Sequence, residues 1–313
     1  MERENIKSRH GLFLLLGVVA LALFLNPLME VAALTRKSEL YSHIPLIPIV
    51  SLYFLFMIRK RVFADAVWSP VPGGVLIGAG LLCFGVGAAL GSAMSRNDYL
   101  SLMMFGLVCW VVGAFTCAYG VQAFKRALFP LLFLVFLVPV PEVIIDPYIT
   151  LLQRLSADSS HLVFILTGVP FFREGQVFAL PGMTVEVAKE CSGIRSSLAL
   201  IITCVVAGKL FLDNKWLRGV LVLAVIPVTI FKNSLRIVTL SILGAYVDPA
   251  FITGHWLHRS GGMPFFVVGL LLMAPVLWGL RRVEKGRLER KAKFEVRSTK
   301  LETNPNGEIM NSK

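Results

Sequence analysis

The sequence predicts an all-α membrane protein, a polytopic bundle of about eight transmembrane helices. Of its 313 residues, 56% are hydrophobic and only 16% are charged, and the mean hydropathy is +0.74. The apolar residues recur in runs, most of them long enough to cross a hydrocarbon core of about 30 Å. This pattern excludes a soluble globular domain. The runs cover 11–33, 44–58, 72–94, 99–121, 127–140, 192–212, 216–240 and 262–280.

Clusters of basic residues set the expected orientation of the bundle. The formal net charge is +12, but the lysines and arginines stand in short groups between apolar runs. That distribution is typical of a membrane protein, and no nucleic-acid partner is expected. If every cluster is cytoplasmic, eight crossings alternate consistently and both termini lie in the cytoplasm. We therefore expect a multi-pass protein of the cytoplasmic (inner) membrane, with the lipid bilayer as its surroundings.

Three segments depart from the simple pattern. The first run follows a basic N-terminus as a signal peptide would, but its length and weak cleavage site favour a retained helix. The run 44–58 is short and contains two prolines, so it is expected to be kinked or tilted. The stretch 149–169 carries Arg154, Asp158 and His161. It is too polar for a lipid-facing span, and we expect it to be interfacial or to lie over the bundle.

A small extracytoplasmic segment is expected before the motif "CSGIRSS" (191–197). Its end, "GQVFALPGMTVEVAKE" (175–190), shows partial alternation around a Pro-Gly turn, which predicts a β-hairpin. At the other end of the chain, 283–313 is basic and polar and is predicted to be a disordered cytoplasmic tail. The expected organisation is therefore a membrane-embedded domain, 1–282, followed by this tail.

Polar residues gather where the run 192–212 begins. Cys191 stands at the predicted start of this helix, and Ser192 and Gly193 suit a helix N-terminus. The free N–H groups and the dipole there favour a thiolate, which would make the cysteine a better nucleophile. Arg195 is four residues further on and is expected on the same helix face. It could bind an acidic substrate residue or pair with Glu190 or Glu186.

The next run contains "FKNSLRI", with Lys232, Asn233 and Arg236. Ionisable residues inside a span are costly and indicate function by default. The alternative is that both cations extend to the membrane surface along their apolar stems. Lys232 is placed too deep for this, whereas Arg236 is near enough to the outer end of the helix to reach the surface or to join the layer of Cys191.

Two histidines, His255 and His258, precede the last run in "GHWLHRSGG". Their spacing could serve a metal, but no third ligand is evident, so neither a metal nor another cofactor is expected. The other four cysteines lie inside apolar runs and are interpreted as small buried hydrophobic residues. A cysteine, an arginine and a histidine at one membrane face suggest acyl transfer. The cysteine would attack a carbonyl, the arginine would stabilise the oxyanion or fix the substrate, and the histidine would move protons.

Four motifs together resemble the exosortase/archaeosortase family of membrane-embedded transpeptidases. "YSHIPLIPIVSLYFLF" is similar to its early helix motif, "VEVAKECSGIRSS" to its cysteine motif, "NSLR" to its arginine motif and "LHRSGGMPFF" to its histidine motif. Their order and the expected topology make the resemblance specific, and it covers most of the chain. With a histidine at the third position, the chain resembles the bacterial exosortases more than the archaeosortases.

The resemblance implies a role for each motif. It gives Cys191 as nucleophile, Arg236 as the catalytic arginine and His258 as the third member. We expect Arg195, Asn233, His255 and Glu190 to support this set. It implies cleavage of a C-terminal tripartite sorting signal of the PEP-CTERM type on membrane-anchored proteins, and transfer of the product to a surface acceptor. It also implies a setting of exopolysaccharide production.

Three rival functions stay open at this point. A transporter or channel would use Lys232, Arg236 and Glu190 to line an anion path, but the chain shows no inverted repeat of Gly- or Pro-broken helices. A polysaccharide-assembly component would need no catalytic residue. A membrane acyltransferase would share the cysteine chemistry with a lipid or sugar substrate. Replacing Cys191 with alanine separates the first two from the catalytic hypotheses.

The predicted orientation can be tested by labelling single cysteines in a cysteine-free background with an impermeant maleimide in intact cells. We expect labelling at positions in 141–180 and 245–260, because these loops are predicted to lie outside. Positions in 59–61 and 285–300 should stay unlabelled. Labelling of the C-terminal tail in intact cells would contradict the orientation and the outward-facing site.

Overall fold

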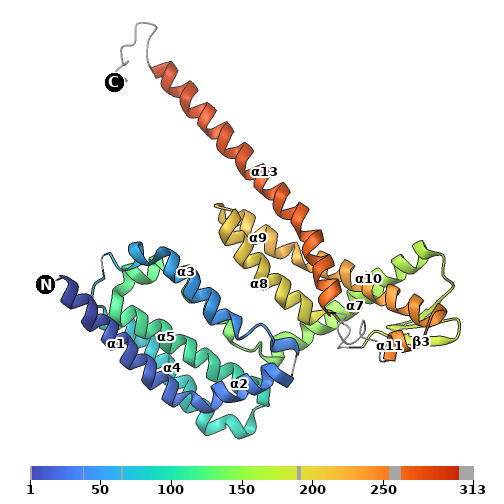
Figure 1. Ribbon diagram of the computed structural model, residues 1–313, viewed down its shortest axis with the longest axis horizontal. Coiled ribbons are helices and arrows are strands. Elements are labelled where there is room, and N and C mark those ends of the chain that lie inside the picture. Colours follow the sequence, from blue (N-terminus) through green and yellow to red (C-terminus); the bar gives the residue numbers. More distant parts are fainter. Residues whose placement is uncertain (1, 38, 65, 189–191, 254–261, 303–313) are drawn as a thin grey trace. The chain divides into compact units, whose positions relative to one another are not determined.

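Helices dominate the computed structural model, which describes residues 2–37, 39–64, 66–188, 192–253 and 262–302 (Figure 1). The chain divides into two units, Met1–Tyr148 and Ile149–Lys313, each with its own set of internal contacts. The predicted class, an all-α membrane bundle with a small β segment, is confirmed by the elements of both units.

The described part of the first unit consists of helices joined by short loops. Its cores are built from the apolar faces of the N-terminal helices packed on the long helix α5. The elements are α1 (Glu2–Leu23), α2 (Leu25–Lys37), η1 (Glu39–Tyr41), α3 (Leu46–Val62), α4 (Pro70–Leu90), η2 (Gly91–Ala93), α5 (Arg96–Arg126), α6 (Leu128–Phe133), η3 (Leu134–Leu137) and the first turns of α7 (Glu142–Thr167).

The second unit combines a small sheet with helices. The strands β1 (Phe172–Glu174), β2 (Val177–Leu180) and β3 (Met183–Glu186) form an antiparallel sheet in the order β1-β2-β3. The predicted hairpin is β2 and β3, paired with Leu180 opposite Met183 across the Pro-Gly turn; β1 was not foreseen. The helices are the rest of α7, α8 (Ile194–Phe211), α9 (Lys215–Leu223), α10 (Val225–Tyr246), α11 (Ala250–Thr253) and α13 (Gly262–Glu302).

The number of spans is smaller than the eight runs suggested. Within the described residues, six helices are long and apolar enough to cross a membrane, or seven if one bent pair counts as a span. The bent pair joins Leu128–Leu137 to Glu142–Thr167 at 81°, so 149–167 of the ambiguous stretch 149–169 form the second part of α7. The run 44–58 forms α3, which has only 17 residues. The orientation of the spans stays a prediction.

Glycines spaced seven residues apart bring α4 and α5 into close contact. Gly80 of α4 lies so near α5 that a Cβ there would be 2.7 Å from the Gly106 carbonyl oxygen. In the same way, a Cβ on Gly113 of α5 would be 2.8 Å from the Gly73 carbonyl oxygen. Lipid gives helices no hydrophobic reason to associate, so close backbone packing through small residues has to supply the contact. These helices therefore depend on glycine at the shared face.

A break in α5 ties the loop before α4 to the same helix. Gly120 has φ 90°, outside the helical region, and a Cβ there would be 2.3 Å from the Val67 carbonyl oxygen. The loop uses carbonyls near the break as acceptors. Val67 N donates to Tyr119 O over 3.2 Å, and Ser69 N donates to Cys117 O over 3.4 Å. Only glycine adopts this φ without strain and leaves room for the loop.

A polar network closes one end of the first unit. The Tyr41 hydroxyl donates to Asn97 Oδ1 over 2.5 Å, and Asn97 Nδ2 donates to Val140 O over 2.8 Å. The Asp98 carboxylate accepts from the backbone N–H of Glu142 over 2.8 Å, which satisfies a free donor at the start of α7. Burial, and then the charges of Glu142 and Asp98, raise the pKa of Tyr41 to about 12.

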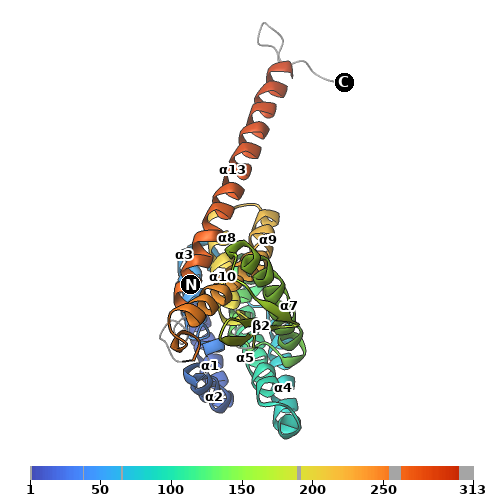
Figure 2. The same ribbon diagram turned by 90° about the vertical axis from the view of Figure 1, so that its right-hand side faces the viewer.

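The C-terminal helix α13 corrects the predicted tail. It continues without interruption to Glu302, past α8 and α9 in both views (Figure 1, Figure 2), so 283–302 is helical and not disordered. The residues of this stretch are mainly good helix formers, and extending an existing helix needs no new nucleus. The Glu284 carboxylate accepts from the N–H groups of Asp213 and Asn214 before α9. Residues 303–313 lie outside the described residues, and 282/283 as a domain boundary stays a prediction.

We expect Gly80→Ala to lower the free energy of unfolding by about 1–3 kcal/mol, because the methyl group would overlap the α5 backbone. The matched change Gly78→Ala should be neutral or slightly stabilising, since the space around Gly78 is open and alanine favours helix. Unfolding midpoints in mixed micelles measure both. Equal destabilisation by the two changes would contradict the glycine-dependent packing.

Candidate functional site

The predicted site residues fall into two groups in the structure. Glu190, Cys191, His255 and His258 lie outside the described residues, and their predicted roles stay predictions. Arg195 is in the first turn of α8, and Asn233 and Arg236 are in the middle of α10. The described part of the site is therefore the junction between the N-terminus of α8 and α10, two helices that are in contact.

The helix α8 begins later than the sequence predicted. Gly193 is its N-cap and has φ 81°, in the left-handed region. Ile194 is the first helical residue, so Cys191 is not part of α8. The expected common helix face of Cys191 and Arg195 is accordingly wrong, since an i, i+4 relation holds only inside a helix. A glycine in the left-handed region precedes the first helical residue, so the described residues 192–197 are a bend and the N-cap followed by helix.

The side chain of Asn233 lies directly against this turn. It is fully buried, and a Cβ on Gly193 would be 3.1 Å from both its Cγ and its Oδ1. The absence of a Cβ therefore serves two purposes at Gly193: the positive φ and the close approach of α10. The pair holds the N-terminus of α8 and the middle of α10 together.

Lys232 makes a second contact at the same place. Its ammonium donates to the Ser196 hydroxyl, and the Ser196 hydroxyl in turn donates to the Gly193 carbonyl over 3.0 Å. Only 2% of Lys232 is exposed. The alternative that Lys232 extends to the membrane surface is therefore wrong. Its stem packs instead near Leu200 of α8 and Gly269 of α13.

The segment before Cys191 is fixed by other elements of the second unit. Gln153 of α7 donates from Nε2 to the Val187 carbonyl over 2.5 Å, and Val187 N donates to Gln176 O over 2.9 Å. Val187 is buried in a core that α7, the sheet and α10 share. The Ser159 and Ser234 hydroxyls, 2.7 Å apart, join α7 to α10. The chain is thus anchored just before and just after the stretch 189–191.

Two arginines complete the described junction. Arg195 and Arg236 are both half-buried. Arg236 is one turn beyond Lys232, so the two cations share a face of α10. With the positive end of α8 nearby, this junction is suited to negative charge, whether a thiolate, an oxyanion or a carboxylate.

Sequence reasoning missed the residues that support this junction. Ser196, Gln153 and Ser159 attract no attention in the sequence, because serine and glutamine occur in many helices. One signal was present: serines recur on α7 and at the start of α8, where a lipid-facing helix has little use for them. Within the described residues, no group of three or more His, Cys, Asp or Glu side chains could hold a metal ion.

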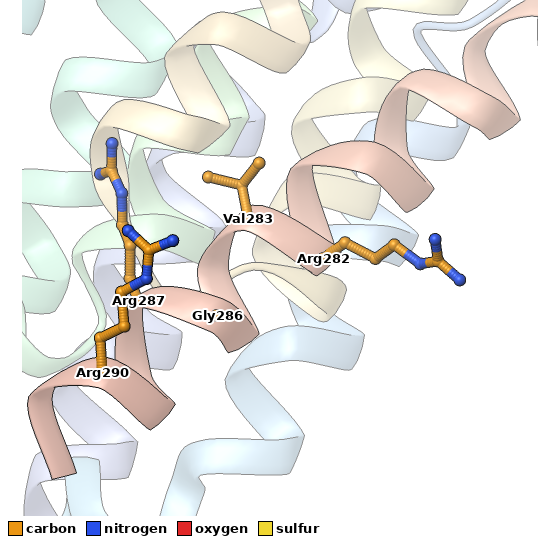
Figure 3. Close-up of a pocket in the computed structure, with 5 residues that line it drawn as sticks. All are labelled: Arg282, Val283, Gly286, Arg287 and Arg290. Atoms are coloured by element: carbon orange, nitrogen blue, oxygen red, sulfur yellow. The ribbon is translucent and has the colours of Figure 1, made fainter. Parts of the chain in front are cut away.

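A separate hollow lies on α13, beyond this junction in sequence, and contains none of the predicted site residues (Figure 3). Arg287 and Arg290 extend to one side of the helix and Arg282 to the other, with Gly286 between them. Arg282 also stacks over the ring of Trp278 at 3.8 Å. All its lining residues come from a single helix: Arg282, Val283, Gly286, Arg287 and Arg290.

Buried cationic and polar side chains between the helices of a membrane bundle define a class, the polytopic membrane proteins with a site within or beside the bilayer. The model of the family of transmembrane exosortases (Exosortase_EpsH) matches residues 35–275. The match spans most of the chain and includes all four motifs, so the chain belongs to the transmembrane exosortase family. No curated protein and no solved structure matches the chain.

The turn at Gly193 gives a direct test of the junction. We expect Gly193→Ala to lower the free energy of unfolding by about 1–3 kcal/mol, because alanine is strained at positive φ and its methyl group would press on Asn233. Gly208→Ala in the same helix is the control: its φ is not positive, and the nearest contact, with the Arg218 side chain, is 3.4 Å. Equal unfolding midpoints for the two variants would contradict the proposed constraint.

Proposed function

We propose that the chain is a membrane cysteine protease and transpeptidase, with Cys191 as nucleophile and Arg236 and His258 as its catalytic partners. One observation supports this most directly. The chain is held on both sides of Cys191, at Val187 by α7 and the sheet and at Gly193 by α10. A nucleophile held between two anchored points can be positioned for attack.

The proposed reaction proceeds through an acyl-enzyme. The Cys191 thiolate attacks the carbonyl carbon of the scissile peptide bond, and the Arg236 guanidinium donates to the oxyanion that forms. As the C–N bond breaks, protonated His258 gives its proton to the leaving amine. A thioester remains between Cys191 and the new C-terminus. The acceptor nucleophile then gives a proton to His258 and attacks the thioester, which releases the thiolate.

The proposed substrates are membrane-anchored proteins that end in a tripartite sorting signal of the PEP-CTERM type. Membership of the exosortase family supports this substrate class. The site is proposed to face the exterior of the cytoplasmic membrane, where an anchored substrate would present its short motif. The product is then transferred to a surface acceptor, and Arg195, Asn233, Glu190 and His255 support the catalytic set.

Variants of the three catalytic residues test the mechanism. Cys191→Ser should reduce processing by about 10³-fold or more, because an alcohol without a strong base is a poor nucleophile. Arg236→Lys should reduce it by about 10²-fold, since lysine lacks the planar fork of guanidinium donors. His258→Ala should reduce it by about 10²-fold or more. Processing is followed by the mobility of a tagged, anchored protein with a C-terminal sorting signal, at matched enzyme levels.

His255→Ala is the matched control for His258→Ala and should have a milder effect. Hydroxylamine should release a substrate–enzyme adduct where the thioester accumulates. Losses at Arg236 and His258 should not add to the loss at Cys191, because members of one catalytic unit act together. Normal processing by Cys191→Ala would refute the cysteine mechanism and favour a transporter or an assembly component. A severe His255→Ala with a benign His258→Ala would exchange the roles of the histidines.

A further inference from the structure

Lys232 is a buried cation for which the proposed mechanism has no role. It lies inside the candidate span Lys215–Tyr246 and is 2% exposed. Placing an ammonium group between membrane helices is costly unless it is hydrogen-bonded, and such residues are retained for a purpose. The surrounding contacts show what the ammonium holds.

The ammonium is joined to the start of α8 by two successive hydrogen bonds. Lys232 donates to the Ser196 hydroxyl, and Ser196 donates to the carbonyl of Gly193. That carbonyl also accepts the helical hydrogen bond from Ser197 N over 2.9 Å. The N-cap of α8 is thus fixed by its own helix, by Lys232 through Ser196, and by the Asn233 side chain packed against it.

We propose that Lys232 is a positioning residue for the Cys191 nucleophile, an inference that rests on the function proposed above. It acts through Ser196 on the turn at Gly193. Only Ser192 separates Gly193 from Cys191 in the sequence, and consecutive α-carbons are about 3.8 Å apart. Displacement of this turn would therefore displace the thiol, and misplacement by about 1 Å is enough to slow a reaction greatly.

The geometry favours positioning over direct catalysis by Lys232. The Ser196 proton is directed to the Gly193 carbonyl, and the ammonium is directed to the Ser196 oxygen. A serine nucleophile activated by lysine would need the opposite arrangement, with the hydroxyl donating to a neutral amine. The charge has a second effect in this place: together with the positive end of α8, it favours the thiolate over the thiol.

Alkylation of Cys191 by iodoacetamide tests the proposal without a substrate. The full chain is used, with the other four cysteines replaced by alanine and the protein in nanodiscs at fixed pH. We expect Lys232→Met to slow alkylation by about tenfold while the unfolding midpoint stays close to that of the parent. Ser196→Ala should slow it by about threefold, and the double variant should be no slower than Lys232→Met alone, because both act on one path.

The direction of the change separates positioning from a merely structural role. A general loosening of the helix junction would ease the access of iodoacetamide and speed alkylation of Cys191, whereas loss of the Lys232 charge and of its hold on the turn slows it. Two control variants remove the same chemical groups elsewhere in the second unit. Lys215→Met removes an ammonium at the exposed start of α9. Thr203→Ala removes an exposed hydroxyl that donates to Ala199 O over 2.8 Å. Both should react at the parent rate.

The alkylation rates of the variants can also refute the positioning role of Lys232. The proposal is refuted if folded Lys232→Met is alkylated at the parent rate or faster. It is also refuted if the fold-reduction of the alkylation rate in the double variant equals the product of the two single reductions. If Lys232→Met does not fold, Ser196→Ala decides, and parent-rate alkylation of that variant refutes the proposal. The Cys191→Ala processing assay is run in parallel. Normal processing there refutes the cysteine mechanism itself, whereas loss of processing with parent-rate alkylation in Lys232→Met refutes only the role of Lys232.

Discussion

A buried ammonium among apolar helices has to be hydrogen-bonded, and this constraint organises the second unit. Lys232 satisfies it at the start of α8, through Ser196. Its stem lies beside Gly269 of α13 and near Leu200 of α8, so α8, α10 and α13 meet around one side chain. Removing water makes the contact strong and also makes any alternative partner costly. The cation therefore specifies how these three helices pack.

The first unit reaches close packing by another route. Its long helix α5 meets α4 through glycines every seven residues, with backbone against backbone. A polar network from Tyr41 to Asn97 and the Val140 carbonyl then fixes the loops at one end. Neither the glycine contact nor this polar network contains a predicted site residue. Backbone packing through glycine suits a scaffold in lipid, where hydrophobic burial does not distinguish one helix arrangement from another.

The proposed chemistry belongs to the second unit, between two anchored points. The sheet and α7 hold Val187, and α10 packs against Gly193. Irregular backbone in a membrane protein has to be buried in protein or lie at the surface, because lipid cannot satisfy its polar groups. The proposed cysteine mechanism would benefit from this arrangement, because a nucleophile needs a rigid support on both sides.

The sequence by itself determined the class, the apolar helices and the hairpin β2–β3, because hydropathy and alternation are local signals. It also singled out Lys232, Asn233 and Arg236 as costly polar residues inside an apolar run, and their roles stay predictions. Only the tertiary structure decided that α8 begins after Gly193 and that Ser196 is the partner of Lys232. These depend on contacts between segments roughly forty residues apart in sequence, which no local pattern encodes. The structure also decided the number of candidate spans among the described residues, six or seven against the eight apolar runs, because a helix bent by 81° and a helix of 17 residues do not show in a hydropathy pattern.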